Sequence, residues 1–309
     1  MIPVLLIYKI FQLFAVMLIG FFAVKIKLLK SEDALALSRV ALYLLMPAAI
    51  INSLQVSLTG EVLIGFLLSC VAAIVLHGIL LAIDLAILKP ARCTATERAS
   101  VFYSNAANLI IPIVSFVLGD EWVIYSLGFM IVQLLFIWSH GVNLFERGSK
   151  INVKKIITNP TVISIVLGLA LALLDVRLPE FVTDITASLS GVLGYVGMLI
   201  AGITAAKLNF RQAVKNKRLY ITSVLRVIAF PIIALLLIRI ALLFITVENA
   251  DKILLISFLA TATPTAATIM QFAQIYDVEK DYSVAINIVT TVLSCLTIPI
   301  FVILYQAIT

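Results

Sequence analysis

The chain has 309 residues, of which 63% are hydrophobic and 12% are charged, and its mean hydropathy is +1.18. Soluble domains are roughly 45–50% apolar and about 25% charged, so this composition excludes an ordinary soluble protein. The net charge of +6 comes from basic residues placed beside apolar segments, and it gives no reason to expect a nucleic-acid partner. The sequence therefore predicts an all-α integral membrane protein in a lipid bilayer.

A membrane-spanning helix needs about 20 mostly apolar residues. The charged and turn-rich clusters divide the chain into ten such stretches, near 3–24, 36–56, 62–84, 97–118, 122–143, 158–174, 185–206, 219–245, 252–274 and 283–306. The connections between them are short, so we expect no attached soluble domain.

Basic residues follow every second span. Of the 22 Lys and Arg residues, 17 lie in or beside the connections after spans 1, 3, 5, 7 and 9. The positive-inside rule places these connections in the cytosol. We therefore expect a protein of the bacterial inner (plasma) membrane with both termini outside.

Span 3 contains His77, followed seven residues later by Asp84 on the same helical face. A histidine at this depth could relay a proton, which makes His77 a candidate coupling residue. It could equally form a structural hydrogen bond to a backbone carbonyl. The sequence leaves both interpretations open.

Span 4 contains "SNAANLIIP" at 104–112, an unusually polar stretch for an apolar segment. A proline inside a helix costs about 3 kcal/mol or more, and the freed carbonyls need partners in lipid. Broken helices are tolerated where they line an enclosed cavity. We expect Pro112 to hold such a break open, with Asn105 and Asn108 as hydrogen-bond donors.

Spans 8 and 9 supply the next notable residues. Arg226 lies inside span 8, where it could attract an anion or snorkel to the headgroups, and snorkelling is expected. Span 9 contains "LATATPTAATIM", in which Pro264 lies 152 residues after Pro112. Threonine donors surround this second proline at Thr261, Thr263, Thr265 and Thr268.

The two prolines fall at corresponding places in two five-span units. An odd-numbered unit repeated in tandem is inverted the second time, and inverted repeats with broken helices are common in transporters. Helices 4 and 9 are then expected to cross near the midplane, with their half-helix N-termini facing an anion. The alternative is that each proline only kinks its helix and has no role in binding.

The sequence around these two predicted breaks resembles that of the auxin efflux carrier family, which comprises the PIN-type carriers and their bacterial and fungal relatives. Asn105 and Pro112 match a fourth-span Asn seven residues before a Pro, and Pro264 with the following "QIYDVEKDYS" and "LTIPIFVILY" is similar to the family's ninth and tenth spans. Gln133 and Trp138 resemble a Gln and an aromatic residue five apart in the plant carriers' span 5. Both could also pack between helices.

The resemblance implies two inverted five-helix repeats, at 1–144 and 158–309, joined by a cytosolic loop at 145–157. Spans 1, 2, 6 and 7 would form a scaffold and a homodimer contact, and spans 3–5 and 8–10 a transport domain that moves as an elevator. Family substrates are small organic anions. The candidate substrate-binding residues are Asn105, Asn108, Pro112, Gln133, Trp138, Thr263, Pro264 and Thr265.

The expected function is export of a small carboxylate by alternating access. No Asp or Glu falls in the interior of span 4 or 9, so we expect no bound metal or cofactor and export driven by the membrane potential. A proton- or sodium-coupled symporter or antiporter and a channel are the alternatives. An enzyme is not expected, because the sequence lacks HExxH, GxSxG, a P-loop and paired buried aspartates.

Overall fold

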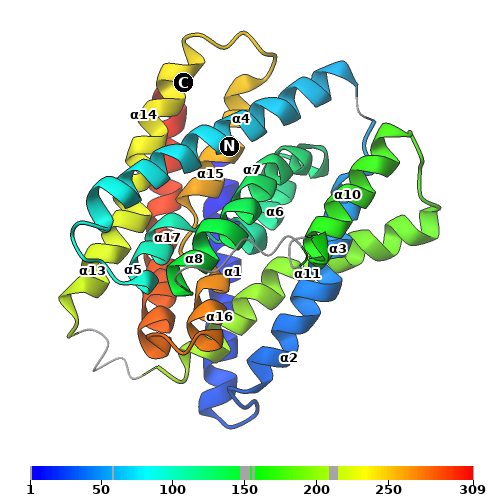
Figure 1. The fold of residues 1–309 in the computed structure, drawn as a ribbon. Helices are drawn as coiled ribbons and strands as arrows, with labels where there is room; N and C mark the ends of the chain where they lie inside the picture. Colours follow the sequence, from blue (N-terminus) through cyan, green and yellow to red (C-terminus); the bar gives the residue numbers. More distant parts are fainter. Residues whose placement is uncertain (1, 58, 147–153, 155–156, 209–214, 309) are drawn as a thin grey trace.

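The computed structural model describes residues 2–57, 59–146, 154, 157–208 and 215–308 (Figure 1). Within these ranges every regular element is a helix. Seven helices are long and apolar enough to cross a membrane: Ile7–Lys25, Asp33–Ser53, Gly60–Leu88, Asp120–Phe145, Glu180–Ala205, Lys217–Leu242 and Lys280–Ala307. They coincide with the expected spans 1, 2, 3, 5, 7, 8 and 10. Most of the expected loop at 145–157 lies outside the described residues.

The three other expected spans are shorter or divided. Span 6 is the 14-residue helix α10 (Pro160–Leu173). Span 4 consists of α5 (Ala95–Phe102) and α6 (Ala106–Val117), and span 9 of α15 (Ala250–Ala262) and α16 (Ala267–Ile275). The remaining elements are α1 (Ile2–Lys25), α2 (Asp33–Val40), η1 (Ala41–Leu45), α3 (Met46–Ser53), α4 (Gly60–Ile83), η2 (Asp84–Leu88), η3 (Asp120–Trp122), α7 (Val123–Phe136), η4 (Ile137–Gly141), α8 (Val142–Phe145), α11 (Glu180–Ala205), α13 (Lys217–Val224), η5 (Leu225–Ala229), α14 (Phe230–Leu242) and α17 (Lys280–Ile308).

Several helices begin at recognisable caps. Thr94 and Glu97 form a reciprocal capping box at the start of α5, which satisfies two backbone N–H groups that the first turn leaves unpaired. Asn159 caps α10 through the Thr161 N–H, with Pro160 as the first helical residue. Among the described residues, π-turns interrupt three of the long helices, at η1, η4 and η5, and a fourth, η2, ends the helix Gly60–Leu88; such turns often mark functional positions.

One group of helices contains α1, α3, α10 and α11. Helix α1 packs along α11, and α3 packs against both α10 and α11. The backbones of α1 and α11 touch, because a β-carbon built on Gly202 would lie 1.9 Å from the Met17 carbonyl oxygen. Small residues allow such close approach where lipid removes the hydrophobic drive for helix association. These four helices correspond to the expected spans 1, 2, 6 and 7.

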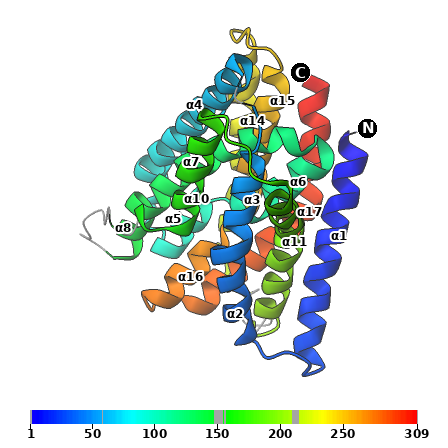
Figure 2. The ribbon, with the colours of Figure 1, turned by 90° about the vertical axis from the view of Figure 1, so that its right-hand side faces the viewer.

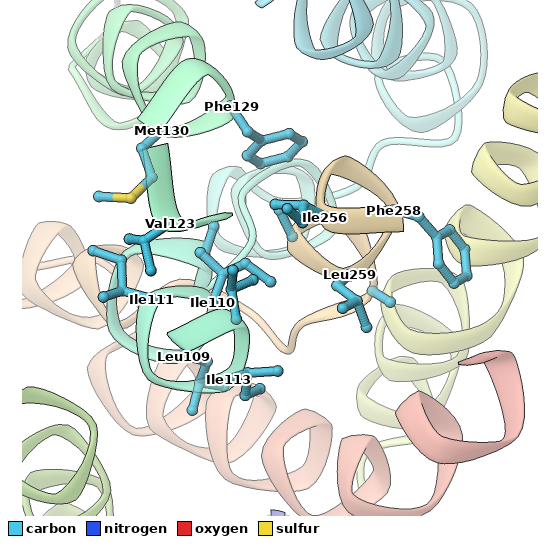
Figure 3. Close-up of a cluster of buried hydrophobic side chains, with 14 of the residues drawn as sticks. Leu109, Ile110, Ile111, Ile113, Val123, Phe129, Met130, Ile256, Phe258 and Leu259 are labelled. Atoms are coloured by element: carbon cyan, nitrogen blue, oxygen red, sulfur yellow. The ribbon is translucent and has the colours of Figure 1, made fainter. Parts of the chain in front are cut away.

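A second group surrounds α6, most of whose apolar side chains are almost fully buried, with Phe116 as an exposed exception. Figure 3 shows them between side chains of α7 and α15. The labelled residues are Leu109, Ile110, Ile111 and Ile113 from α6, Val123, Phe129 and Met130 from α7, and Ile256, Phe258 and Leu259 from α15. The half-helix after the first break is therefore fixed by packing on both sides.

The start of α1 and the end of α17 lie at the same end of the bundle in both views (Figures 1 and 2). The two helices also pack against each other. The first and last helices of the described chain therefore place their outer ends at the same end of the bundle.

Candidate functional site

The two broken helices meet backbone to backbone. Ser104 and Thr265 form an isolated antiparallel bridge. The Asn105 N–H donates to the Pro264 carbonyl (2.8 Å), and the Ala266 N–H donates to the Tyr103 carbonyl (2.9 Å). Each break therefore supplies partners for the backbone groups that the other break leaves open, which is the requirement for irregular backbone inside a membrane.

Pro112 does not lie at its break, which corrects the role predicted from the sequence. It lies inside α6, while the chain leaves the helix at Tyr103–Asn105. The Pro112 ring packs against α11, where a β-carbon on Gly194 would come within 2.7 Å of it. Pro264, by contrast, lies within the second break, between the end of α15 and the start of α16. The two prolines thus have different structural roles.

A pocket of about 420 Å³ adjoins the crossing. Its described lining contains polar and apolar side chains but no Asp, Glu, Lys, Arg or His. It lies between the two helix groups, since the lining comes from the segments 38–46, 104–108, 130–138, 158–161, 197–200 and 266–275.

Asn105 and Asn108 both line the pocket. The Asn108 Nδ2 donates to the Asn105 Oδ1 at 3.0 Å, and the Asn105 side chain makes no cap bond to α6. In the described part of the chain, the side-chain Nδ2–H groups of Asn105 have no protein acceptor. They are consequently available as donors to a ligand.

Helix N-termini also face the pocket. Residues at the start of α16 (Ala266, Ala267 and Thr268), at the start of α6 and at the start of α10 all belong to its lining. The first turn of a helix leaves backbone N–H groups without intrahelical partners and carries the positive end of the helix dipole. The dipoles of these helices favour an anion at the pocket, although at α10 Pro160 has no N–H and Asn159 already accepts from the Thr161 N–H.

Gln133 is in the pocket wall but is already engaged. Its Oε1 accepts from the Ser104 N–H (3.1 Å) and Oγ (2.6 Å), and its Nε2 donates to the Ser104 carbonyl (2.9 Å). Gln133 therefore fixes the first break. Trp138 lines the pocket and meets Phe272 edge to face, with ring centroids 5.8 Å apart.

Thr263, Pro264 and Thr265 are not part of the pocket lining. Both threonines are fully buried, and their hydroxyls donate to backbone carbonyls, from Thr263 to Ala260 and from Thr265 to Ser100. The predicted donor role thus does not fit their orientation here. Thr268 and Gln271 line the pocket instead. The sequence patterns did not indicate Gln271 as a candidate substrate-binding residue, although it lies four residues after Ala267 on the helix that follows the break.

Arg226 contradicts the expectation that it snorkels. Its side chain is fully buried in η5 and donates to the carbonyls of Val101, Thr261 and Thr263. These carbonyls belong to the ends of α5 and α15. The apolar surroundings of Arg226 in the sequence gave no sign of these partners, which lie more than 30 residues away along the chain.

His77 is buried among the rings of Phe102, Phe129 and Phe136, and its Nδ1 lies 2.8 Å from the Ala73 carbonyl. No carboxylate hydrogen-bonds to it in the described part of the chain. Asp84 instead pairs with Arg98 and with the second histidine, His140.

His140 connects this ion pair to the first break. Its Nε2 lies 3.2 Å from an Asp84 carboxylate oxygen, and its Nδ1 lies 2.9 Å from the Tyr103 hydroxyl. The same hydroxyl lies 2.8 Å from the Phe136 carbonyl, to which it donates. The Tyr103 hydroxyl thus lies between the Phe136 carbonyl and His140, at the end of a chain of contacts that begins at Asp84.

Comparison with known families gives one match. The family model described as a membrane transport protein matches residues 5–155 and 147–302 of the chain. No curated protein matches the chain.

Proposed function

The chain belongs to the membrane transport protein family, that of the auxin efflux carriers, and from this premise we propose that it exports a small organic anion by alternating access. The substrate is a carboxylate, bound in the pocket beside the crossed breaks. The observation that carries the proposal is a pocket lined by helix N-termini and by Asn105, without a charged side chain in its described lining.

The position of the pocket supports an elevator movement. Its lining comes from both helix groups, with Met46 and Gly197 from α3 and α11 and Asn108 and Met130 from α6 and α7. We propose that the chain has ten spans in two inverted repeats and that the second group carries the anion past a dimeric scaffold. We also propose that both termini lie outside, so that Ser38 and Thr158 in the lining would lie near the cytosolic connections, which supports a pocket open to the cytosol.

The membrane potential can drive this export. The pocket offers no described acidic side chain for a compensating cation, so the loaded carrier would move one net negative charge. One elementary charge crossing about 100 mV corresponds to about 2.3 kcal/mol, which favours export from an inside-negative cell about fiftyfold.

Removing the side-chain amide of Asn105 tests the proposed site. Removing a hydrogen bond to a charged group costs about 1.5–3 kcal/mol, so Asn105→Ala should raise the half-saturation concentration for export at least about tenfold. The measurement is saturable flux of labelled mono- and dicarboxylates from proteoliposomes. Flux that does not saturate would favour a channel.

Asn216→Ala is the matched control, because Asn216 caps α13 through the Arg218 N–H and is exposed. It removes the same side chain outside the pocket and should leave half-saturation unchanged. An unchanged half-saturation in Asn105→Ala as well would reject Asn105 as a substrate ligand.

A specific observation favours proton coupling as the second candidate function. His140 contacts Asp84 through Nε2 and the Tyr103 hydroxyl through Nδ1, so the gain or loss of a ring proton would change its hydrogen bonds to both residues. The charged groups facing His140 are Asp84 and Arg98, and Tyr103 is its titratable neighbour. Protonation is thereby linked to a residue at the break.

A voltage step and a pH step separate the two candidates. Electrogenic export should follow the imposed potential, and it should keep this response in His140→Gln and in His77→Gln. Flux that ignores potential, follows a pH step and loses the pH response in His140→Gln would establish proton coupling through His140. Loss of the response in His77→Gln alone would assign coupling to His77.

A further inference from the structure

Arg226 holds the ends of both broken helices at once. Its Nη1 donates to the Val101 carbonyl (3.1 Å), near the end of α5. Its Nε and Nη2 donate to the Thr263 carbonyl (3.1 and 2.8 Å), and Nη2 also donates to the Thr261 carbonyl (2.5 Å), both at the end of α15. One guanidinium therefore joins three carbonyl oxygens from segments more than 150 residues apart.

The charge of Arg226 is matched by helix ends. None of the ion pairs among the described residues includes it, and its side chain is fully buried. Each helix C-terminus carries roughly −0.5 elementary charge, so the ends of α5 and α15 together present about −1. A guanidinium, at +1, offsets this charge at a position where the arginine side chain is fully buried.

Converging backbone carbonyl oxygens are also how proteins coordinate free cations in membranes. We infer that the crossing contains a cation site of backbone carbonyls from Val101, Thr261 and Thr263, and that the side chain of Arg226 occupies it as a fixed cation. When the side chain is removed, this site should bind a small monovalent cation, guanidinium or Na⁺, from solution.

This inference bears on coupling, and in that part it rests on the proposed function. A carrier with a fixed cation at its crossing needs no dissolved cation to offset the C-terminal half-helix ends. The N-terminal ends of α6 and α16 then keep their positive potential for the anion. Wild-type export should accordingly be independent of Na⁺, and Arg226→Ala should acquire a cation requirement.

Thermal unfolding of purified Arg226→Ala in detergent tests the site without any substrate. Its Tm should lie below that of the wild type, and it should rise by at least about 2 °C in millimolar guanidinium or Na⁺ relative to choline at equal ionic strength. Arg239→Ala is the matched control, since Arg239 is exposed on α14 of the same span. Neither it nor the wild type should respond.

An Arg226→Ala protein that responds to neither cation, or only as Arg239→Ala does, would overturn the inference. If Arg226→Ala does not accumulate in folded form, Arg226→Lys and Arg226→Gln decide the matter. Arg226→Lys should be recovered folded and Arg226→Gln should not, whereas equal recovery would show that charge is not what the crossing requires. Because unfolding needs no transport, a failure here is distinguishable from a failure of anion export.

Discussion

Gln133→Leu should greatly destabilise the protein and abolish transport. The substitution keeps the size of the side chain but leaves the Ser104 N–H, hydroxyl and carbonyl without their partner. Each buried polar group left unpaired costs about 1–3 kcal/mol, so the free energy of unfolding should fall by at least about 3 kcal/mol. The first break would then lose the side chain that fixes its backbone.

The measurement is thermal unfolding in detergent, together with export from proteoliposomes. Gln271→Leu is the control for stability, because Gln271 lies in the same pocket wall and the described residues give it no hydrogen bond. Gln133→Glu retains the acceptor for Ser104 but removes the donor and adds a buried charge, so it should also destabilise. If Gln133→Leu had the same Tm as Gln271→Leu, the proposal that Gln133 fixes the first break would be wrong.

Asp84→Ala should have a comparable effect through a different mechanism. The Asp84 side chain is fully buried and accepts from Arg98 Nε (2.8 Å), Arg98 Nη2 (2.5 Å) and His140 Nε2 (3.2 Å). Removing one partner of a buried pair costs about 3–5 kcal/mol, because the remaining charge is left uncompensated. The Tm should fall accordingly.

A double-mutant cycle with Arg98→Ala isolates the pair. The double variant should be less destabilised than the sum of the single variants, since neither charge remains unpaired. Glu32→Ala is the control: the hydrogen bond from Lys207 lowers the pKa of the Glu32 carboxyl, but that pair is exposed. Surface pairs contribute little, so Tm should not change. Strict additivity of Asp84→Ala and Arg98→Ala would mean that the ion pair itself adds no stability.

The amino-acid sequence by itself determined the class of the protein and pointed to the region of the candidate site. Transfer of a helix into lipid depends on the summed apolarity of about 20 consecutive residues, so composition alone placed the long spans. Proline and asparagine inside apolar runs marked two interruptions, and Asn105, Asn108, Gln133 and Trp138 all line the pocket beside them.

The tertiary structure decided where each interruption falls and which side chains face the pocket. The first break lies at Tyr103–Asn105 rather than at Pro112, because its backbone groups pair with Pro264 and Ala266 across the crossing. Thr263 and Thr265 are absent from the pocket lining, because their hydroxyls donate to the Ala260 and Ser100 carbonyls instead.

Arg226 shows the limit of the sequence most clearly. An arginine in an apolar span normally reaches for water, and this one remains buried only because two helix ends, distant in the chain, place three carbonyl oxygens around it. Local sequence fixes how each residue partitions into lipid, but the partners that satisfy a buried polar group come from elsewhere in the fold. Those partners were decided by the packing of the two broken helices against each other.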